Sequence, residues 1–407
     1  LAEKPSVGRD IARVLGCNKL FRGLSVMLAL VLGTSAALPA MAAEPTVQIA
    51  VPEVTVGTSD DANTYAIYPI PQSIIYGGGD FTLKDVVIVA EEGIDVYTTD
   101  FVKEVLGDYN VSYKEAATVQ SGKTNILLGI DGSNGVVDTY VNNNVEIIDD
   151  ALYEKNDAYM LNASDDVIVI EGKDTDSVYY GVATLQMMFS SFGGEKFLDA
   201  HIEDYATVAT RGYIEGFYGS WDWDSRADLM EFARDYKMNS YVYAAKNDSY
   251  HTNNWDDLYP ASWLAEFEKL VEISRATKVE FGWSIHMGSF FNGLSLSNTT
   301  EYEARYAKLM AKFDQLYQIG VRDFDILNDD FGSGSHADVV TVLNRINADL
   351  KEKYADDPCD NISYCPQGYN KAWSGNGAEL TALKNLDEDI YLYWTGDDVN
   401  SPIKQST

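Results

Sequence analysis

Residues 320–330 read GVRDFDILNDD, and this stretch decides how the second half of the chain folds. Its centre, Asp323–Leu327, has the apolar residues of a buried strand, and Asn328-Asp329-Asp330 follow directly. The next five residues, FGSGS, are the kind of Gly/Ser-rich segment that forms loops. The stretch therefore predicts a strand that ends in a cluster of polar side chains.

The same arrangement recurs on both sides of this stretch. Five further apolar segments predict strands: Gly212–Glu215, Ser240–Ala244, Val279–Ile285, Ile362–Cys365 and Ile390–Trp394. Amphipathic segments between them predict helices, among them Ser225–Tyr236, Ala261–Ala276 and Glu301–Ile319. Strands alternating with helices at this spacing are typical of a (β/α)₈ barrel, although a doubly wound sheet alternates in the same way.

The positions of the polar residues distinguish these two folds. Each predicted strand is followed by polar or aromatic residues: Glu215–Gly219, Lys246–Asp248, His286, Asn328–Asp330, Gln367–Tyr369 and Thr395–Asp397. Barrel active sites are built at the C-terminal ends of successive strands. The pattern therefore favours an α/β fold with a TIM barrel over residues 206–407, and only six of its eight strands are recognisable.

Residues 65–205 predict a smaller α/β domain in front of the barrel. Its β-branched runs are Val86–Ala90, Asn125–Gly129 and Val167–Glu171, and the last pairs with Tyr159–Asn162 in a hairpin whose turn is residues 163–166. A helix is predicted over Ser177–Phe192. Since no catalytic constellation occurs here, we expect an accessory domain.

The first 64 residues divide into three segments. Residues 17–43 have a basic flank, an apolar core and the small residues Ala40-Met41-Ala42, which together predict a secretory signal cleaved near Ala42 or Ala43. A buried core helix is the alternative for the apolar run. Residues 44–64 are a linker. Residues 1–16 (LAEKPSVGRDIARVLG) resemble the start of a bacterial type IA topoisomerase, and because nothing downstream continues that resemblance we expect an extraneous stub.

Composition excludes several classes of partner. The chain of 407 residues has 63 acidic and 30 basic residues, a net charge of −33, which repels nucleic acids and acidic membranes. Its 4 His and 3 Cys show no zinc-ligand spacing, so no metal or other cofactor is expected. Cys359 and Cys365 are expected to remain reduced. The classes of protein that composition leaves open are a soluble acidic enzyme and a binding protein.

Asp329 and Asp330 are the main catalytic candidates. Adjacent acidic residues are common in so acidic a chain, but this pair closes an apolar strand, where aromatic walls can drive two carboxyl pKa values apart. The alternative is an ordinary solvated turn. Lys246 is a second candidate because it follows an apolar strand, and the alternative for it is a surface lysine.

Five segments together resemble glycoside hydrolase family 84. They are Arg211–Gly219 (RGYIEGFYG), Asn239–Asp248 (NSYVYAAKND), Gly320–Asp330, Tyr364–Tyr369 (YCPQGY) and Tyr393–Gly396 (YWTG). The family contains secreted bacterial β-N-acetylglucosaminidases, hyaluronidase-like toxins and the eukaryotic enzyme that removes O-linked N-acetylglucosamine. Residues 65–205 resemble the domain that precedes the barrel in bacterial members and in family 20 hexosaminidases.

The resemblance implies a retaining mechanism in which the substrate's own acetamido oxygen attacks its anomeric carbon. Asp329 would orient the acetamido group, and Asp330 would act as general acid and then as general base. Gly216 and Lys246 match positions that hold sugar hydroxyls, and Tyr369 matches a donor to the acetamido oxygen. Trp394 and Val399 would lie at the rim of the site.

The chain also departs from the family pattern. Ala245 and Asn247 replace a Pro and an Asp, and His286-Met287 replaces a Ser-Pro. The family's last sugar-binding Asn and Asp lie beyond Thr407, so we expect an incomplete barrel. The expected partner is a glycan or glycoprotein that carries N-acetylglucosamine, outside the cell, with no nucleic acid and no membrane after signal cleavage. A hyaluronidase and a non-catalytic glycan-binding protein are the alternatives.

Overall fold

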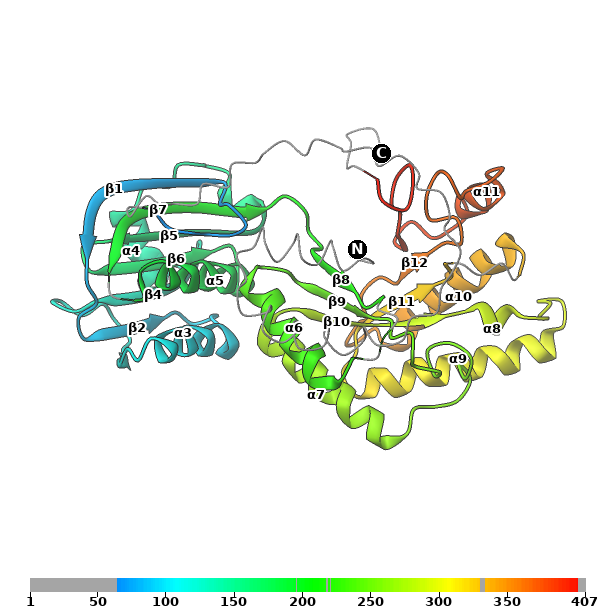
Figure 1. The fold of residues 1–407 in the computed structure, drawn as a ribbon. Coiled ribbons are helices and arrows are strands. Elements are labelled where there is room, and N and C mark those ends of the chain that lie inside the picture. Colours follow the sequence, from blue (N-terminus) through cyan, green and yellow to red (C-terminus); the bar gives the residue numbers. More distant parts are fainter. Residues whose placement is uncertain (1–63, 195, 217–218, 220, 330–333, 402–407) are drawn as a thin grey trace, which may run out of the picture.

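The computed structural model describes residues 64–401, except residues 195, 217–218, 220 and 330–333. Within this range the chain forms two sheets, each with its own helices, and the two units lie side by side (Figure 1). The expected stub, the signal segment, residues 44–63 of the linker and the catalytic candidate Asp330 lie outside the described residues.

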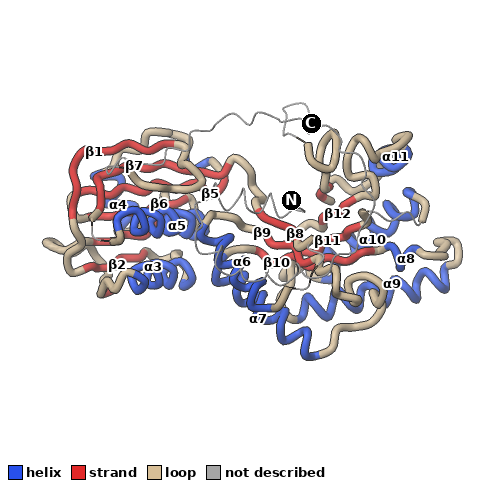
Figure 2. The backbone as a smooth tube through the Cα atoms, viewed as in Figure 1, coloured by secondary structure: helices blue, strands red, loops and turns tan. Residues whose placement is uncertain are grey.

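The first sheet has seven strands. They are β1 (Ser73–Phe81), β2 (Val86–Ala90), β3 (Tyr113–Glu115), β4 (Asn125–Ile130), β5 (Asn156–Ser164), β6 (Val167–Gly172) and β7 (Phe197–Ala206). Their order across the sheet is β1-β7-β5-β6-β4-β2-β3. The β1-β7-β5-β6 part is antiparallel, and the β6-β4-β2-β3 part is parallel. Figure 2 shows these strands in red beside the helices in blue.

Helices and short segments cover both faces of this sheet. They are α3 (Val96–Asp108), α4 (Val136–Asn144), α5 (Thr175–Phe192) and the short 3₁₀ helix η1 (Leu152–Glu154). Val86 and Ile88 of β2 pack with α3 and α5 in one apolar core, while Val87 and Val89 pack with α4 and η1 in another. The two-residue period of the strand therefore sends alternate side chains into separate cores.

The predicted hairpin of this domain is present, but its turn is shorter than predicted. Strand β5 continues through Ser164, so the turn is Asp165-Asp166 instead of the four residues 163–166. Both aspartates have positive φ, 51° and 64°. Two left-handed residues match the twist of the flanking strands in a two-residue hairpin, and aspartate tolerates that conformation better than most residues do.

The second sheet has six strands, and all neighbouring pairs in it are parallel. They are β8 (Gly212–Ile214), β9 (Ser240–Tyr243), β10 (Glu280–His286), β11 (Asp323–Leu327), β12 (Ser363–Cys365) and β13 (Tyr391–Leu392). Each strand lies next to its neighbour in the sequence, in the order β13-β12-β11-β10-β9-β8. A doubly wound sheet would reverse its strand order at a switch point. The order is therefore that of a barrel, of which the described residues form part.

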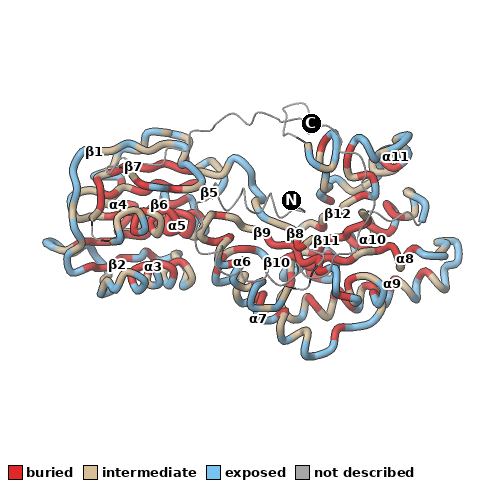
Figure 3. The backbone as a smooth tube through the Cα atoms, viewed as in Figure 1, coloured by how far each residue is buried: buried red, intermediate tan, exposed pale blue. Residues whose placement is uncertain are grey.

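Helices cover one face of the second sheet. They are α6 (Trp223–Asp235), α7 (Ala261–Thr277), α8 (Gly288–Phe291), α9 (Thr299–Gln318), α10 (His336–Lys353) and α11 (Ala378–Leu383). Phe281, Trp283, Phe324 and Ile326 point to this face and are buried in one apolar core. Figure 3 shows the buried backbone concentrated in the central strands and in parts of these helices.

Ion pairs join the two units. Arg234 at the end of α6 donates from both terminal guanidinium nitrogens to Glu104 of α3, each at 2.9 Å. The Lys237 ammonium donates to Asp204 Oδ2 at 2.9 Å and to the Tyr159 hydroxyl at 2.8 Å, both in the first unit. Glu104 is exposed, whereas Lys237 and Asp204 are both buried, so the second pair is the one shielded from water.

Two further expectations can be compared with the structure. No disulfide joins Cys359 and Cys365, which both lie in the described part of the chain, and that they stay reduced remains a prediction. Among the helices in the described part of the chain, none is both long enough and apolar enough to cross a bilayer.

Candidate active site

The strand register brings the predicted site residues to one edge of the second sheet. His286 of β10 is paired with Leu327 of β11, and Leu327 is paired with Cys365 of β12. The residues that follow these strands include Asp329 and Tyr369. Since parallel strands all end at the same edge, side chains from 80 residues of sequence converge there.

The segment after β8 carries Gly216 and is fixed by Glu215. The buried Glu215 carboxylate accepts two hydrogen bonds from Arg226 of α6, at 2.8 and 3.0 Å, and one from the Tyr241 hydroxyl at 2.5 Å. A bidentate arginine pair holds a carboxylate in one orientation. The neighbouring Gly216 is half-buried, and a Cβ atom there would meet nothing within 4 Å, so its backbone borders open space.

The turn after β9 carries Lys246 and is fixed by Asp248. The Asp248 carboxylate is buried and accepts hydrogen bonds from the Tyr259 hydroxyl (2.6 Å), the Tyr243 hydroxyl (3.2 Å) and the Tyr250 amide (2.8 Å). Burial raises the pKa of Asp248, and these three donors oppose that rise. The Asp248 amide also donates to the Ala245 carbonyl at 3.0 Å, which closes the turn around the exposed Lys246.

A buried histidine packs against the end of β10. His251 is 3% exposed, its Nδ1 lies 2.8 Å from the carbonyl oxygen of Ser284, and its own carbonyl accepts from the His286 amide at 2.9 Å. The pKa of His251 is lowered to about 4, chiefly by burial; the Ser284 carbonyl and Asp329 oppose this, whereas positive charge on His286 and Lys246 adds to it. His251 is therefore neutral near pH 7, and the other three residues all lie within electrostatic reach of its ring.

His286 fixes the backbone of Asp329. Its Nδ1 accepts from the Gly288 amide at 3.3 Å, and its Nε2 lies 3.1 Å from the Asp329 carbonyl oxygen. Because Nδ1 is an acceptor, Nε2 carries the proton and donates to that carbonyl. The next residue along the chain is Asp330, which lies outside the described residues.

The loops after β12 and β13 are tied to each other. The Thr395 amide donates to the Tyr369 carbonyl at 3.0 Å, and the Lys371 amide donates to the Gly396 carbonyl at 2.9 Å. Trp394, 41% exposed, therefore lies on a loop held against the loop of Tyr369. Val399 is half-buried farther along the same loop, and its amide donates to the Asp398 carboxylate at 2.8 Å.

A pocket of about 420 Å³ lies beside the Tyr369 loop. Its lining includes Gln367, Gly368, Trp373 and Glu379. The Glu379 carboxylate accepts from the amides of Gln367 (3.0 Å) and Gly368 (2.8 Å), and so shapes the backbone that leads to Tyr369. The ring of Trp373 meets the Tyr369 ring edge to face, with centroids 5.1 Å apart.

Sequence reasoning named the residues at the strand ends but missed those that hold them. The hydrogen bonds that hold the Glu215 and Asp248 carboxylates were not predicted, and His286 was named as a strand-end residue and as a departure from the family pattern, without a role. Their partners lie 11 to 43 positions away in the sequence, at Arg226, Tyr259 and Asp329. Only the polar character of the strand ends could have indicated them.

A parallel barrel sheet with its polar residues at the C-terminal strand ends, behind an α/β domain, is the architecture of a barrel enzyme. The family model described as beta-N-acetylglucosaminidase matches residues 211–407, and the one described as glycosyl hydrolase family 20, domain 2, matches residues 64–205. These matches correspond to the second and first sheets with their helices.

Individual proteins agree with these family matches. The chain is 28% identical over 208 residues to the protein O-GlcNAcase of mouse (Mus musculus), an alignment that covers 47% of this chain and 21% of that protein. The solved structure of CpGH84D superposes with a TM-score of 0.75 at 37% identity, over 84% of this chain and 57% of that one. The structure of CpGH84B gives 0.69 at 29% identity, over 83% and 57%.

These findings confirm the resemblance to glycoside hydrolase family 84 seen in the sequence, and they support an O-GlcNAcase-type protein. The chain spans about a fifth of the length of the curated relatives that it matches, and 57% of the two solved structures.

Proposed function

We propose that the chain carries the active site of a retaining glycoside hydrolase that removes terminal β-linked N-acetylglucosamine from glycans or glycoproteins. The observation that carries this proposal is the parallel register of β9, β10 and β11. Lys246, His286 and Asp329 lie at or directly after the C-terminal ends of these strands, and His286 Nε2 lies 3.1 Å from the Asp329 carbonyl oxygen. In a family 84 chain, this is where the substrate would bind.

In the proposed reaction the carbonyl oxygen of the substrate's acetamido group attacks the anomeric carbon, and the bond to the leaving oxygen breaks. Asp330 gives its proton to the leaving oxygen. The Asp329 carboxylate accepts the acetamido N–H and stabilises the positive charge of the oxazoline. Asp330 then takes a proton from water, which attacks the anomeric carbon and reopens the oxazoline to N-acetylglucosamine with its original configuration.

The remaining residues position the reactants. Because His286 donates to the Asp329 carbonyl, it would hold the backbone of that residue in one place as charge develops. Lys246 and Gly216 would contact the sugar hydroxyls, and Tyr369 would donate to the acetamido oxygen. Trp394 and Val399 would border the sugar at the rim. We also propose that the protein acts outside the cell, on the evidence of the signal-like residues 17–43.

The test is hydrolysis of 4-nitrophenyl N-acetyl-β-D-glucosaminide by the purified protein. We expect Asp330→Asn to lower turnover by about 10²–10⁴-fold, the usual contribution of a general acid-base residue. Asp329→Asn should lower it by about 10²–10³-fold, as loss of one charge-stabilising group does. Hyaluronan serves as the competing substrate, and the net charge of −33 disfavours its approach.

The matched control is Asp356→Asn, the same substitution at an exposed aspartate after α10, which should leave turnover unchanged. Full activity in both site variants would rule out the assigned roles. A folded protein without turnover on the glucosaminide would overturn the proposal, and cleavage of hyaluronan alone would replace it with the hyaluronidase alternative.

A further inference from the structure

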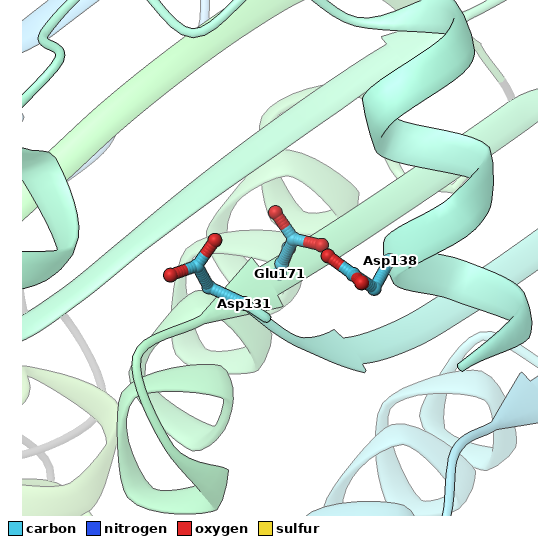
Figure 4. Close-up of side chains that lie close together, drawn as sticks. All are labelled: Asp131, Asp138 and Glu171. Atoms are coloured by element: carbon cyan, nitrogen blue, oxygen red, sulfur yellow. The ribbon is translucent and has the colours of Figure 1, made fainter. Parts of the chain in front are cut away.

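Three carboxylates of the first domain gather far from the barrel site. Asp131 follows β4, Asp138 lies in the first turn of α4, and Glu171 lies near the end of β6. One oxygen atom from each lies within 4.8 Å of the others. Figure 4 shows the Glu171 carboxylate between those of Asp131 and Asp138. Asp131 is exposed, whereas the other two are buried.

The loop between β4 and α4 is held by a fourth carboxylate. Glu91 accepts hydrogen bonds from the amides of Ile130 (3.2 Å) and Asp138 (2.8 Å) and from the Ser133 hydroxyl (2.8 Å), and also from the amide of Val137. All of these donors are on or beside the loop. Glu91 is thus occupied with the loop itself, and it fixes the positions from which Asp131 and Asp138 project.

Asp138 is also partly occupied. Its Oδ1 accepts from the Gly132 amide at 3.2 Å and the Asn142 side chain at 3.1 Å, and its Oδ2 accepts from the Asn134 amide at 2.8 Å. A carboxylate has about four acceptor positions. Asp138 therefore has one position left, enough for a single further contact.

One carboxylate oxygen of Glu171 accepts no hydrogen bond from any described residue. The side chain is 2% exposed, and its Oε2 accepts from the Tyr153 hydroxyl at 2.8 Å. Its Oε1 is buried and has no hydrogen-bond partner among the described residues. An unsatisfied buried carboxylate oxygen is costly, so in a native protein it indicates a partner of another kind.

The charged groups around Glu171 are themselves carboxylates, and their negative charge disfavours the ionised form of Glu171. The pKa of Glu171 is raised to about 8, chiefly by burial; the hydrogen bond from Tyr153 opposes the rise, and the charges of Asp138, Asp131 and Glu91 add to it. Burial and the charge of Asp138 also raise the pKa of Asp131. The neighbouring charges that act on these carboxylates are negative, and a cation bound among them would relieve both the burial and the repulsion.

We propose that Asp131, Asp138 and Glu171 bind a calcium ion. Calcium takes six to eight oxygen ligands at about 2.3–2.6 Å, so two of its ligands can be up to about 5 Å apart, and the three oxygen atoms of this cluster all lie within 4.8 Å of one another. Magnesium demands closer and near-octahedral ligands, which suits carboxylates fixed by loop hydrogen bonds less well. The exposed side at Asp131 leaves room for water ligands.

The expectation of no metal came from the spacing of histidines and cysteines, which concerns zinc and not an all-oxygen site. A calcium ion bound to these three carboxylates would link β4, β6 and the start of α4. The proposed site lies in the first domain and the proposed active site lies in the second, so calcium binding can be tested independently of hydrolysis.

The experiment measures the melting temperature (Tm) of the full chain after chelator treatment, with and without added Ca²⁺. At a concentration about 100-fold above the dissociation constant, Ca²⁺ should raise the Tm by roughly 5–10 °C. Glu171→Gln should remove most of this rise, and without Ca²⁺ it should be at least as stable as the wild type because a repelled carboxyl is gone. Glu146→Gln, at an exposed position of the same domain, should keep the full rise.

A second measurement uses terbium, which replaces calcium and emits when a nearby tyrosine is excited. Tyr153 lies against Glu171, so Tb³⁺ emission should appear on tyrosine excitation and decline when Ca²⁺ competes. Asp131→Asn, an exposed change that does not disturb the core, should weaken the emission severalfold. No Tm rise with Ca²⁺, equal rises in the wild type and Glu171→Gln, or an equal rise with Mg²⁺ would each overturn the proposal.

Discussion

The two sheets of the molecule are built from similar β-branched and aromatic strands, but they differ in their second faces. In the first sheet, Ile126 and Leu128 of β4 enter one apolar core, and Leu127 between them enters the other. In the second sheet, Phe324 and Ile326 of β11 enter the core beneath the helices, but Asp323 and Asp325 point to the opposite face.

The opposite face of the second sheet is charged and yet partly buried. Asp325 is fully buried, and it accepts one hydrogen bond from the Tyr393 hydroxyl at 2.5 Å while its Oδ2 has no partner among the described residues. Gly282 on β10 makes room for both aspartates, because a Cβ atom there would overlap their carboxylates. Burial, and next the charge of Asp323, raise the pKa of Asp325 well above its usual range.

This difference in side-chain polarity accompanies a difference in architecture, because the helices that the structure describes cover both faces of the first sheet but only one face of the second. A sheet with two apolar faces must be covered by helices on both sides, and the first sheet is. Within the described ranges the second sheet has helices over one face only, and in a closed barrel its other face, which carries Asp323 and Asp325, would be turned to the interior. The three predictions below test this comparison.

The largest effect is expected at the second face of the first sheet. Leu127 is completely buried there. Leu127→Ala should lower the free energy of unfolding by about 2–5 kcal/mol, because it removes apolar contacts and leaves a cavity. The measurement is chemical denaturation of the full chain, with hydrogen exchange to locate the weakened strands.

Leu127→Met is the control, since it nearly conserves volume and should cost less than about 1.5 kcal/mol. If Leu127→Ala cost no more than Leu127→Met, this face would not be a packed core, and the contrast between the two sheets would fail.

The next effect is expected at the contact between the two units. Lys237 is buried against Asp204 and the Tyr159 hydroxyl, so Asp204→Asn should destabilise the chain by about 1.5–3 kcal/mol, the usual worth of a charged hydrogen bond. Glu266→Gln breaks an exposed pair with Lys269 and should change stability by less than about 0.5 kcal/mol. Equal effects of the two substitutions would mean that the units are joined by other contacts.

Much of the second sheet could be predicted because local sequence and tertiary structure agree there. The strand Asp323–Leu327 was predicted with its observed bounds, and the other five begin within one residue of their predicted starts. Each is a short apolar run between turn residues, and a parallel strand buried against helices needs that pattern. The same agreement placed Lys246, Asp329 and Tyr369 at the strand ends.

The first sheet could be predicted less completely because its pairing is long-range. Strand β1 was not predicted, since it contains Gly77, Gly78 and Gly79, and its pairing with β7 joins Ser73 to Glu203 across 130 positions. Glycine weakens a strand's local preference, so only the partner strand determines the structure there. The acidic cluster at Glu171 was missed for the same reason, because its three members come from separate elements.

The smallest change in stability is expected at the charged face of the second sheet, and it is an increase, whereas the two substitutions above decrease stability. The pKa of Asp325 is raised well above its usual range and that of Asp323 to about 7, chiefly by burial. A carboxyl whose folded-state pKa is raised binds its proton more tightly than the unfolded chain does, so its contribution to stability is complete below the unfolded pKa of about 3.9. That contribution is lost as pH rises from about 4 through the raised pKa values.

Asp325→Asn should therefore leave stability unchanged at pH 4 and raise it by about 1 kcal/mol above pH 7, because the amide still accepts from Tyr393 without a charge. Asp356→Asn, at an exposed position, should leave the pH dependence as it is. Denaturation at several pH values gives the slopes, and hydrogen exchange shows whether β10 and β11 account for them. A variant that is less stable than the wild type above pH 7 would mean that a cation faces Asp325, and that the inner face of this sheet is neutralised as the first domain's cluster is proposed to be.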